Sequence, residues 1–269
     1  MTIVQASICN NGKCIIIVGD RLVSVTSYHI AYEKEAKKSK IYQFKKNIIG
    51  LAGNVSDITE IKNLIDEKEQ YVEEFVEDVS KVMKNKINQS KDDFIEEYTL
   101  HSRVDFKKNK QGHDGTIPNE IKALVYSKLP FFKFECEGII AGFDKKKTAR
   151  IFYINNRGNY IDRTELYKFS IGSGYPFSEF FFDQEHFDYE CFLEEGLYFA
   201  YMAKRSAEAH VGVGPKTDIF ILTKDQEPIF LSAESDKIKL LDGYYKSEKE
   251  NILKTRIGLF EKIKEEIIK

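Results

Sequence analysis

MTIVQASICNNGKCIIIVGDRL, residues 1–22, contains the pattern on which the interpretation of this chain depends. Two apolar, β-branched runs at 3–9 and 14–18 flank an Asn-Gly dipeptide, and this arrangement is a strong signal for a β-hairpin. Thr2 directly follows the initiator methionine, so the β pattern begins at the second residue. Because an ordinary domain tolerates several loose residues at its start, we expect the N-terminus itself to be functional.

The composition is that of a globular protein. The chain has 269 residues, of which 42% are hydrophobic and 31% charged, with a formal net charge of −2. That length allows one large domain or two small ones. The near-neutral charge gives no reason to expect nucleic acid or an anionic membrane as a partner. No stretch approaches the ~18 apolar residues of a membrane span, and the N-terminus lacks a secretory signal. We therefore expect a cytoplasmic protein.

The cysteines and glycines indicate no cofactor. Cys9, Cys14, Cys136 and Cys191 form no CxxC pair. The first two flank the hairpin turn and could face each other, but buried free thiols are the favoured interpretation. The glycines of GVGP at 212–215 form neither a P-loop nor a dinucleotide fingerprint. We expect neither a metal nor an organic cofactor.

Further strands and helices follow in blocks. Apolar runs at 40–44 and 47–52 predict a second hairpin, and both hairpins are apolar on both faces in places, which predicts a sheet covered on both sides. From Asn54 the apolar spacing becomes helical. The first half of the chain is then predicted to form helices at 54–67, 71–87 and 91–100, followed by a surface loop at 105–120.

The second half of the chain returns to strands. Its predicted elements are strands at 137–143, 149–155 and 167–174, helices at 175–183 and 193–209, strands at 217–225 and 228–232, and a charged amphipathic helix at 242–269. Helices grouped between blocks of strands favour two stacked sheets with helices outside over an alternating βαβ chain. We expect one domain over 1–235, with an insertion at about 101–125, and a C-terminal helical extension over 236–269.

A threonine at a mature N-terminus has a specific chemistry. Its hydroxyl is a weak nucleophile alone, but the neutral α-amine of the same residue can accept the proton, directly or through water. The ordinary pKa of this amine is about 7.7–8.0, and a nearby cation lowers that pKa. The scheme requires removal of Met1, which a small second residue such as Thr2 permits.

This chemistry also needs a lysine near the hydroxyl, an acid to position that lysine, and backbone N–H donors for the oxyanion. The sequence offers a candidate for each. Asp20 ends the second strand in GDR, and Lys40 begins the third strand in KIYQF, with Lys38 as its main competitor. Gly53 follows the fourth strand, where a turn leads into a helix N-terminus with free N–H groups.

The order of these features resembles proteasome β subunits and the related bacterial HslV peptidase. The resemblance is carried by the threonine and first hairpin, then GDR, KIYQF and IIGLAGNVSD, and later by SIGSGYPFSEFFFD at 170–183 and TDIFILTKD at 217–225. It covers about residues 2–65 and 137–230. The resemblance implies an α+β fold, the four-layer αββα sandwich of N-terminal nucleophile hydrolases.

The resemblance also implies the roles of five residues. Thr2 matches the catalytic nucleophile, with its own amine as the base. Asp20 and Lys40 match the acid–lysine pair that tunes it. Gly53 matches the oxyanion-hole glycine, and Ser173 matches the serine near the terminal amine. The implied activity is that of a threonine-type peptidase acting on peptides or unfolded proteins. The implied assembly is a ring of identical subunits, and an ATP-dependent unfoldase is left open as a partner.

The chain departs from the family pattern in several places. The segment between Asp20 and Lys40 is longer, which we expect to alter the rim of the substrate site. Where proteasome β subunits carry an aspartate before the last Gly-rich turn, this chain has AEAHVGVG, with Glu208 and His210 nearby. The loop at 105–120 and the C-terminal tail match nothing in the pattern.

Two alternatives to a peptidase remain open. An amine that intercepts the same acyl-enzyme would make the protein a peptide ligase or transpeptidase. A catalytically silent structural subunit would keep Met1 and ignore threonine-directed electrophiles.

Overall fold

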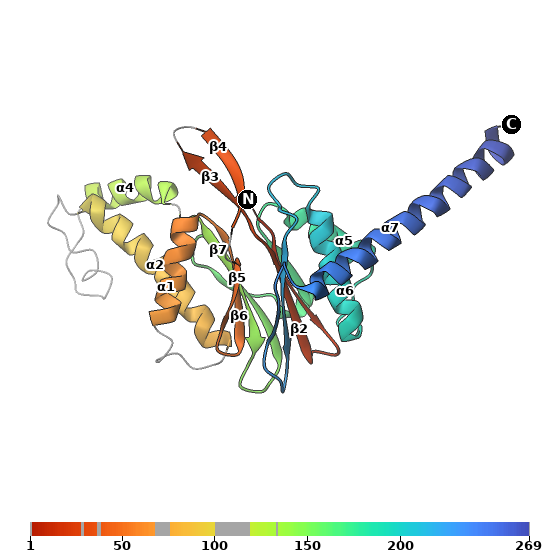
Figure 1. The fold of residues 1–269 in the computed structure, drawn as a ribbon. Helices are drawn as coiled ribbons and strands as arrows, with labels where there is room; N and C mark the ends of the chain where they lie inside the picture. Colours follow the sequence, from red (N-terminus) through yellow and green to blue (C-terminus); the bar gives the residue numbers. More distant parts are fainter. Residues whose placement is uncertain are drawn as a thin grey trace.

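Two antiparallel sheets, each of five strands, lie face to face between two layers of helices (Figure 1). The predicted four-layer αββα sandwich is therefore confirmed. The structure is a computed structural model that describes residues 2–27, 30–36, 39–67, 76–99, 119–132 and 134–268.

The first sheet contains the N-terminal hairpin at its centre. Its strands, in spatial order, are β10 (Lys168–Ile171), β1 (Val4–Cys9), β2 (Cys14–Asp20), β11 (Thr217–Thr223) and β12 (Ile229–Leu231). The turn between β1 and β2 has positive φ at three successive residues, Asn10, Asn11 and Gly12. Asparagine and glycine are the residues that adopt this conformation most easily, so the Asn-Gly signal correctly predicted the hairpin.

The second sheet contains the other predicted hairpin. Its strands, in spatial order, are β5 (Ile41–Phe44), β6 (Asn47–Gly53), β7 (Cys136–Phe143), β8 (Ala149–Ile154) and β9 (Tyr160–Asp162). The short strand β9 was not predicted. Its Tyr160 ring stacks on Phe152 of β8, with ring centroids 4.7 Å apart.

Apolar side chains fill the space between the sheets and also the outer face of each sheet. On β2, Ile15 and Ile17 face the other sheet, whereas Ile16 and Val18 face the helices on the outside. Successive residues of a strand point to opposite faces. The uninterrupted apolar run of β2 is therefore explained by burial on both faces, as predicted.

Helices cover the outer face of each sheet. Helices α1 (Val55–Glu67) and α2 (Val76–Thr99) lie on the second sheet, and α5 (Tyr175–Gln184) and α6 (Leu193–Ala207) lie on the first. Short 3₁₀ helices occupy Leu129–Phe131 and Thr164–Leu166. No helix in the described ranges is long and apolar enough to cross a bilayer.

One helical prediction beside the second sheet was wrong, and one helix was not predicted. The predicted break between 87 and 91 does not exist, because α2 continues to Thr99. Helix α4 (Asn119–Lys128) was not predicted, and only its first two residues overlap the loop expected at 105–120. Its Val125 is buried, and tertiary packing of this kind overrides a weak local pattern. Residues 71–75 and 100 of the predicted helices and 101–118 of the predicted insertion lie outside the described residues.

A third, small sheet was also missed. Strands β3 (Leu22–Ser27) and β4 (Ile30–Glu35) pair as an antiparallel hairpin in the long segment between Asp20 and Lys40. In Figure 1 this hairpin projects from the body beside the N-terminus. The extra length of this segment thus forms a hairpin near the candidate site.

The C-terminal helix, α7 (Asp236–Ile263), begins six residues earlier than the predicted 242. The hydroxyl of Ser235 caps it by accepting a hydrogen bond from Ile238 N–H, and a π-helical turn over Lys264–Ile268 ends it. Its first half touches the body, where Tyr201 and Tyr198 of α6 donate to Asp242 and Glu248. Figure 1 shows the remainder projecting away from the sandwich.

Candidate active site

Thr2 lies immediately before β1 and is held by the turn after β10. Its backbone N donates to Ser173 Oγ at 3.3 Å, and its carbonyl accepts from Gly174 N–H at 3.2 Å. The side chain is nearly buried, with 4% of its surface exposed. Met1, whose removal the N-terminal threonine scheme requires, lies outside the described residues. The structure therefore brings Ser173 next to the backbone nitrogen of Thr2.

The hydroxyl of Thr2 lies between a lysine and an aspartate. Lys40 Nζ donates to Thr2 Oγ1 at 2.5 Å, and the Thr2 hydroxyl donates to Asp20 Oδ1, also at 2.5 Å. Lys40 Nζ and Asp20 Oδ1 are 2.9 Å apart, so the lysine and the aspartate also form an ion pair. An ammonium beside a hydroxyl stabilises the negative charge that the oxygen develops when it loses its proton.

Asp20 is fully buried, and backbone groups fix its carboxylate in addition to Thr2 and Lys40. The N–H of Ile3 donates to Oδ1 at 3.0 Å. The N–H groups of Leu22 and Gly214 donate to Oδ2 at 2.9 and 3.1 Å. Charge-assisted hydrogen bonds of this kind are stronger than neutral ones. They hold the carboxylate in one orientation below the hydroxyl.

The three side chains come from both sheets. Thr2 precedes β1 and Asp20 ends β2 of the first sheet, where Asp20 N–H donates to the Ile3 carbonyl at 3.2 Å. Lys40 precedes β5 of the second sheet, where its carbonyl accepts from Leu51 N–H at 3.1 Å. The site therefore forms only when the sheets stack, at the end where both hairpins begin.

A hollow of about 340 Å³ opens beside Thr2, which is a volume found for small-molecule sites. Its walls are Thr2, Ala52, Gly53, Glu135, Cys136, Glu137, Asn156, Gly172 and Ser173. Gly53 has a φ of +139°, and a Cβ at this position would lie 1.9 Å from the Glu135 carbonyl. Only glycine fits there, so Gly53 brings its backbone to the edge of the hollow.

One acid of this hollow, Glu137, was missed by the sequence interpretation. Its Oε1 accepts from Gly172 N–H at 3.0 Å, and its Oε2 accepts from the Tyr153 hydroxyl at 2.8 Å. Burial, and secondarily the Glu137 charge, raises the pKa of Tyr153, so the phenol remains a donor. The only signal in the sequence was a charged residue inside the apolar strand CEGIIAGF.

Solved structures with the same architecture include two of Anbu, a protein described as an ancestral β-subunit. A mutant of Anbu from Hyphomicrobium sp. strain MC1 matches with a TM-score of 0.61 at 16% identity, covering 94% of this chain and 97% of that one. Anbu from Yersinia bercovieri matches with a TM-score of 0.63 at 13% identity, covering 94% and 96%. The fold is that of a proteasome-type β subunit. The predicted resemblance is thus confirmed for the fold, and these identities show the fold alone.

The likeness to Anbu lies in the structure, at low sequence identity. The sequence matches no protein-family model, and no curated protein matches it. The likeness nevertheless extends along nearly the whole of both chains.

In the sequence, Glu208 and His210 lie near the position where proteasome β subunits carry an aspartate. Within the described ranges, neither side chain forms a hydrogen bond or an ion pair with Thr2. Glu208 pairs with Lys204 at 2.5 Å and with Arg205 at 3.0 Å. His210 Nδ1 accepts from Gly212 N–H at 3.1 Å. Glu208 is therefore tied to helix α6.

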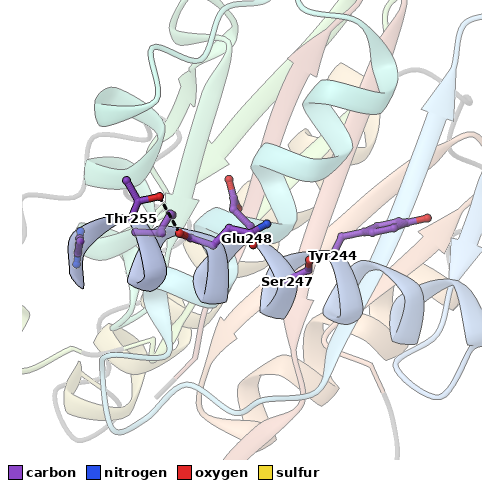
Figure 2. Close-up of a pocket in the computed structure, with 7 residues that line it drawn as sticks. Tyr244, Ser247, Glu248 and Thr255 are labelled. Carbon is purple, nitrogen blue, oxygen red and sulfur yellow. Dashed lines mark hydrogen bonds between the residues drawn. The ribbon is translucent and has the colours of Figure 1, made fainter. Parts of the chain in front are cut away.

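One of the larger hollows in the described residues lies along α7, and no lysine or aspartate is among the residues that line it. It measures about 590 Å³ and is lined only by residues of α7, among them Tyr244, Ser247, Glu248 and Thr255, which Figure 2 shows along one side of the helix. A single helix cannot enclose a ligand. In the ranges that the structure describes, no three His, Cys, Asp or Glu side chains could hold a metal ion.

Proposed function

We propose that this protein is an N-terminal threonine hydrolase that cleaves peptide bonds. The observation that carries the proposal is the position of Thr2 Oγ1, which is 2.5 Å from both Lys40 Nζ and Asp20 Oδ1 at the edge of a hollow. If Thr2 had no function, there would be no reason for a lysine and an aspartate to lie together at its side-chain oxygen. The resemblance to proteasome β subunits favours a peptide as the substrate.

The reaction starts from Thr2 with its amine free. The amine takes the hydroxyl proton, directly or through a water, and Oγ1 attacks the carbonyl carbon of the substrate. Lys40 stabilises the negative charge on Oγ1 as the proton leaves, while Asp20 holds the ammonium in place. Gly53 is the candidate donor to the oxyanion, since a preorganised N–H at that point lowers the barrier.

Collapse of the tetrahedral intermediate breaks the C–N bond. The leaving amine takes a proton from the Thr2 ammonium group, and an ester links the acyl group to Oγ1. A water molecule, deprotonated by the same amine, then attacks the ester and regenerates the hydroxyl. Ser173 accepts a hydrogen bond from the Thr2 nitrogen, so it orients the base in both steps.

Intact mass and covalent labelling test this proposal. Native protein should have the mass of a chain that begins at Thr2, and a β-lactone electrophile should add to Thr2 alone. A chain that retains Met1 and does not react would instead identify a silent structural subunit. A Thr2→Ala variant is the matched control, because it keeps a free amine and removes only the nucleophile.

Product analysis distinguishes hydrolysis from ligation. With a peptide substrate and no added acceptor, a hydrolase releases a free carboxylate. In the presence of an acceptor peptide, a ligase or transpeptidase forms a new amide from the same acyl-enzyme. We expect the hydrolytic product to dominate in both reactions.

We also propose that the chain assembles with copies of itself, as proteasome-type subunits do. Apolar side chains of α7 beyond the body are exposed, including Leu253, Ile257 and Phe260. Sedimentation of the full chain should show a mass above that of a monomer. A monomer at micromolar concentration would contradict this proposal and leave the chemistry of Thr2 untouched.

A further inference from the structure

A lysine without any solvent exposure lies behind the candidate site. Lys204 of α6 is 0% exposed, and its Nζ donates to the Gly214 carbonyl at 2.7 Å and to Glu208 Oε1 at 2.5 Å. Burial lowers the pKa of Lys204, and the charges of Glu208 and Asp20 oppose that effect. Fully buried lysines are rare, because the ammonium group loses its hydration.

Gly214 connects this lysine to the aspartate of the site. Its carbonyl accepts the hydrogen bond from Lys204, and its N–H donates to Asp20 Oδ2 at 3.1 Å. The next residue is Pro215, which has no N–H and a fixed φ. Pro215 limits the backbone conformations available next to Gly214. A shift of the Gly214 carbonyl would therefore also move the Gly214 N–H away from the Asp20 carboxylate.

We propose that Lys204 is a positioning residue of the candidate active site, an assignment that rests on the proposed function of Thr2. Lys204 holds the Gly214 carbonyl, and the Gly214 N–H in turn holds Asp20. Asp20 accepts the hydroxyl of Thr2 through its other oxygen. The lysine thus orients the nucleophile through two intermediate groups and does not contact the substrate.

The neighbouring arginine provides a matched control. Arg205 belongs to the same helix and donates to the same Glu208 at 3.0 Å. Its guanidinium lies over the Tyr245 ring, 4.9 Å from the centroid, on the side of α7. If the ion pair with Glu208 were all that mattered, substitutions of Lys204 and Arg205 would have similar consequences.

The test measures covalent modification of Thr2 by a β-lactone in the full chain. The rate at saturation reports the reactivity of the hydroxyl, and the half-saturating concentration reports binding of the probe. We expect Lys204→Met to lower the saturating rate by about 10-fold to 100-fold, the scale of a small misplacement of a reacting group. The half-saturating concentration should change less than about twofold. Arg205→Met should leave both values unchanged.

A conservative variant separates positioning from folding. Lys204→Arg keeps a charged donor and should retain more of the rate than Lys204→Met. Each variant is first compared with the unsubstituted protein by thermal unfolding. If Lys204→Met does not fold, Lys204→Gln replaces it, and if neither neutral variant folds, the lysine is structural and the inference is wrong.

The two proposals fail in different ways. Equal saturating rates for Lys204→Met and the unsubstituted protein would overturn the positioning role alone. An equal loss of rate in Arg205→Met would also overturn it, since the effect would then belong to the ion pair with Glu208. No modification of Thr2 in the unsubstituted protein would overturn the proposed function, and this inference with it.

Discussion

The carbonyl oxygen of Thr2 lies so close to Gly172 that a Cβ on the glycine would be 2.4 Å from it. The φ of Gly172 is +87°, a conformation that other residues adopt only with strain. The N–H of Gly174 donates to the same Thr2 carbonyl at 3.2 Å. The turn after β10 therefore determines where the proposed nucleophile lies.

Gly172→Ala is expected to remove the reactivity of Thr2. The strained backbone costs about 1–3 kcal/mol of stability, and the new methyl group must displace Thr2. Gly12→Ala is the control, because Gly12 also has a positive φ, of +75°, but a Cβ there would meet no atom within 4 Å. Gly12→Ala should lower the unfolding free energy without affecting β-lactone labelling of Thr2. Normal labelling of Gly172→Ala would show that the turn does not position Thr2.

Lys40→Met is expected to slow modification of Thr2 by at least about 100-fold, the scale for loss of one preorganised donor at a reacting oxygen. Methionine keeps much of the side-chain length and removes only the charged donor. Lys38→Met is the control; Lys38 lies outside the described residues and is the rival that the sequence alone suggested. If Lys38→Met, rather than Lys40→Met, abolished labelling, the assignment of the lysine would be wrong.

Asp20→Asn should abolish labelling and also destabilise the fold. Both Asp20 oxygens accept hydrogen bonds, so either orientation of the amide would place its NH₂ group against a donor. Asp218→Asn is the matched control, since Asp218 is equally buried and pairs with Arg21 at 2.6 Å. Breaking that pair should cost about 3–5 kcal/mol. Urea unfolding should show both losses, with labelling lost only in Asp20→Asn.

Glu179 on α5 should make the protein less stable as the pH rises. Burial raises the pKa of its carboxyl, so the folded state binds the proton more tightly than the unfolded state. Stability then falls as the pH rises from the ordinary value of about 4.3 through the raised pKa, and the loss persists at neutral pH. Glu179→Gln should be more stable than the parent at pH 7 and similar to it at pH 4 in urea titrations. The exposed Glu185 supplies the control, and an equal gain from Glu185→Gln would contradict the burial argument.

Local patterns were sufficient to predict much of the fold. The Asn-Gly turn, the apolar runs of β1 and β2 and the helical spacing after Asn54 depend on the conformations of neighbouring residues, which the sequence shows directly. Asp20 and Lys40 were found by their places at strand ends, and the structure brings both to Thr2. Their catalytic roles stay predictions.

The parts that were missed depend on contacts between distant segments. Glu137 lies at the site because β7 pairs with β6, and Lys204 lies behind Asp20 because α6 packs on the first sheet. Neither residue carries a motif. The β3–β4 hairpin has the alternation of a half-buried strand in LVSVTS, but IAYEKE is polar enough to suggest a loop. Helix α2 crosses the polar stretch KNKINQS because Met83 and Ile87 are buried against the second sheet.

Helix α7 extends from the body of this chain as a long, rigid helix. Its 28 residues span ~42 Å, and the side chains that follow Glu248 as far as Ile267 are exposed. A dye, an affinity handle or a surface attachment fused beyond it would be carried on a rigid spacer, well away from the opening beside Thr2. Reagents attached there would leave the amine of Thr2 unblocked, which no fusion at the opposite terminus could do.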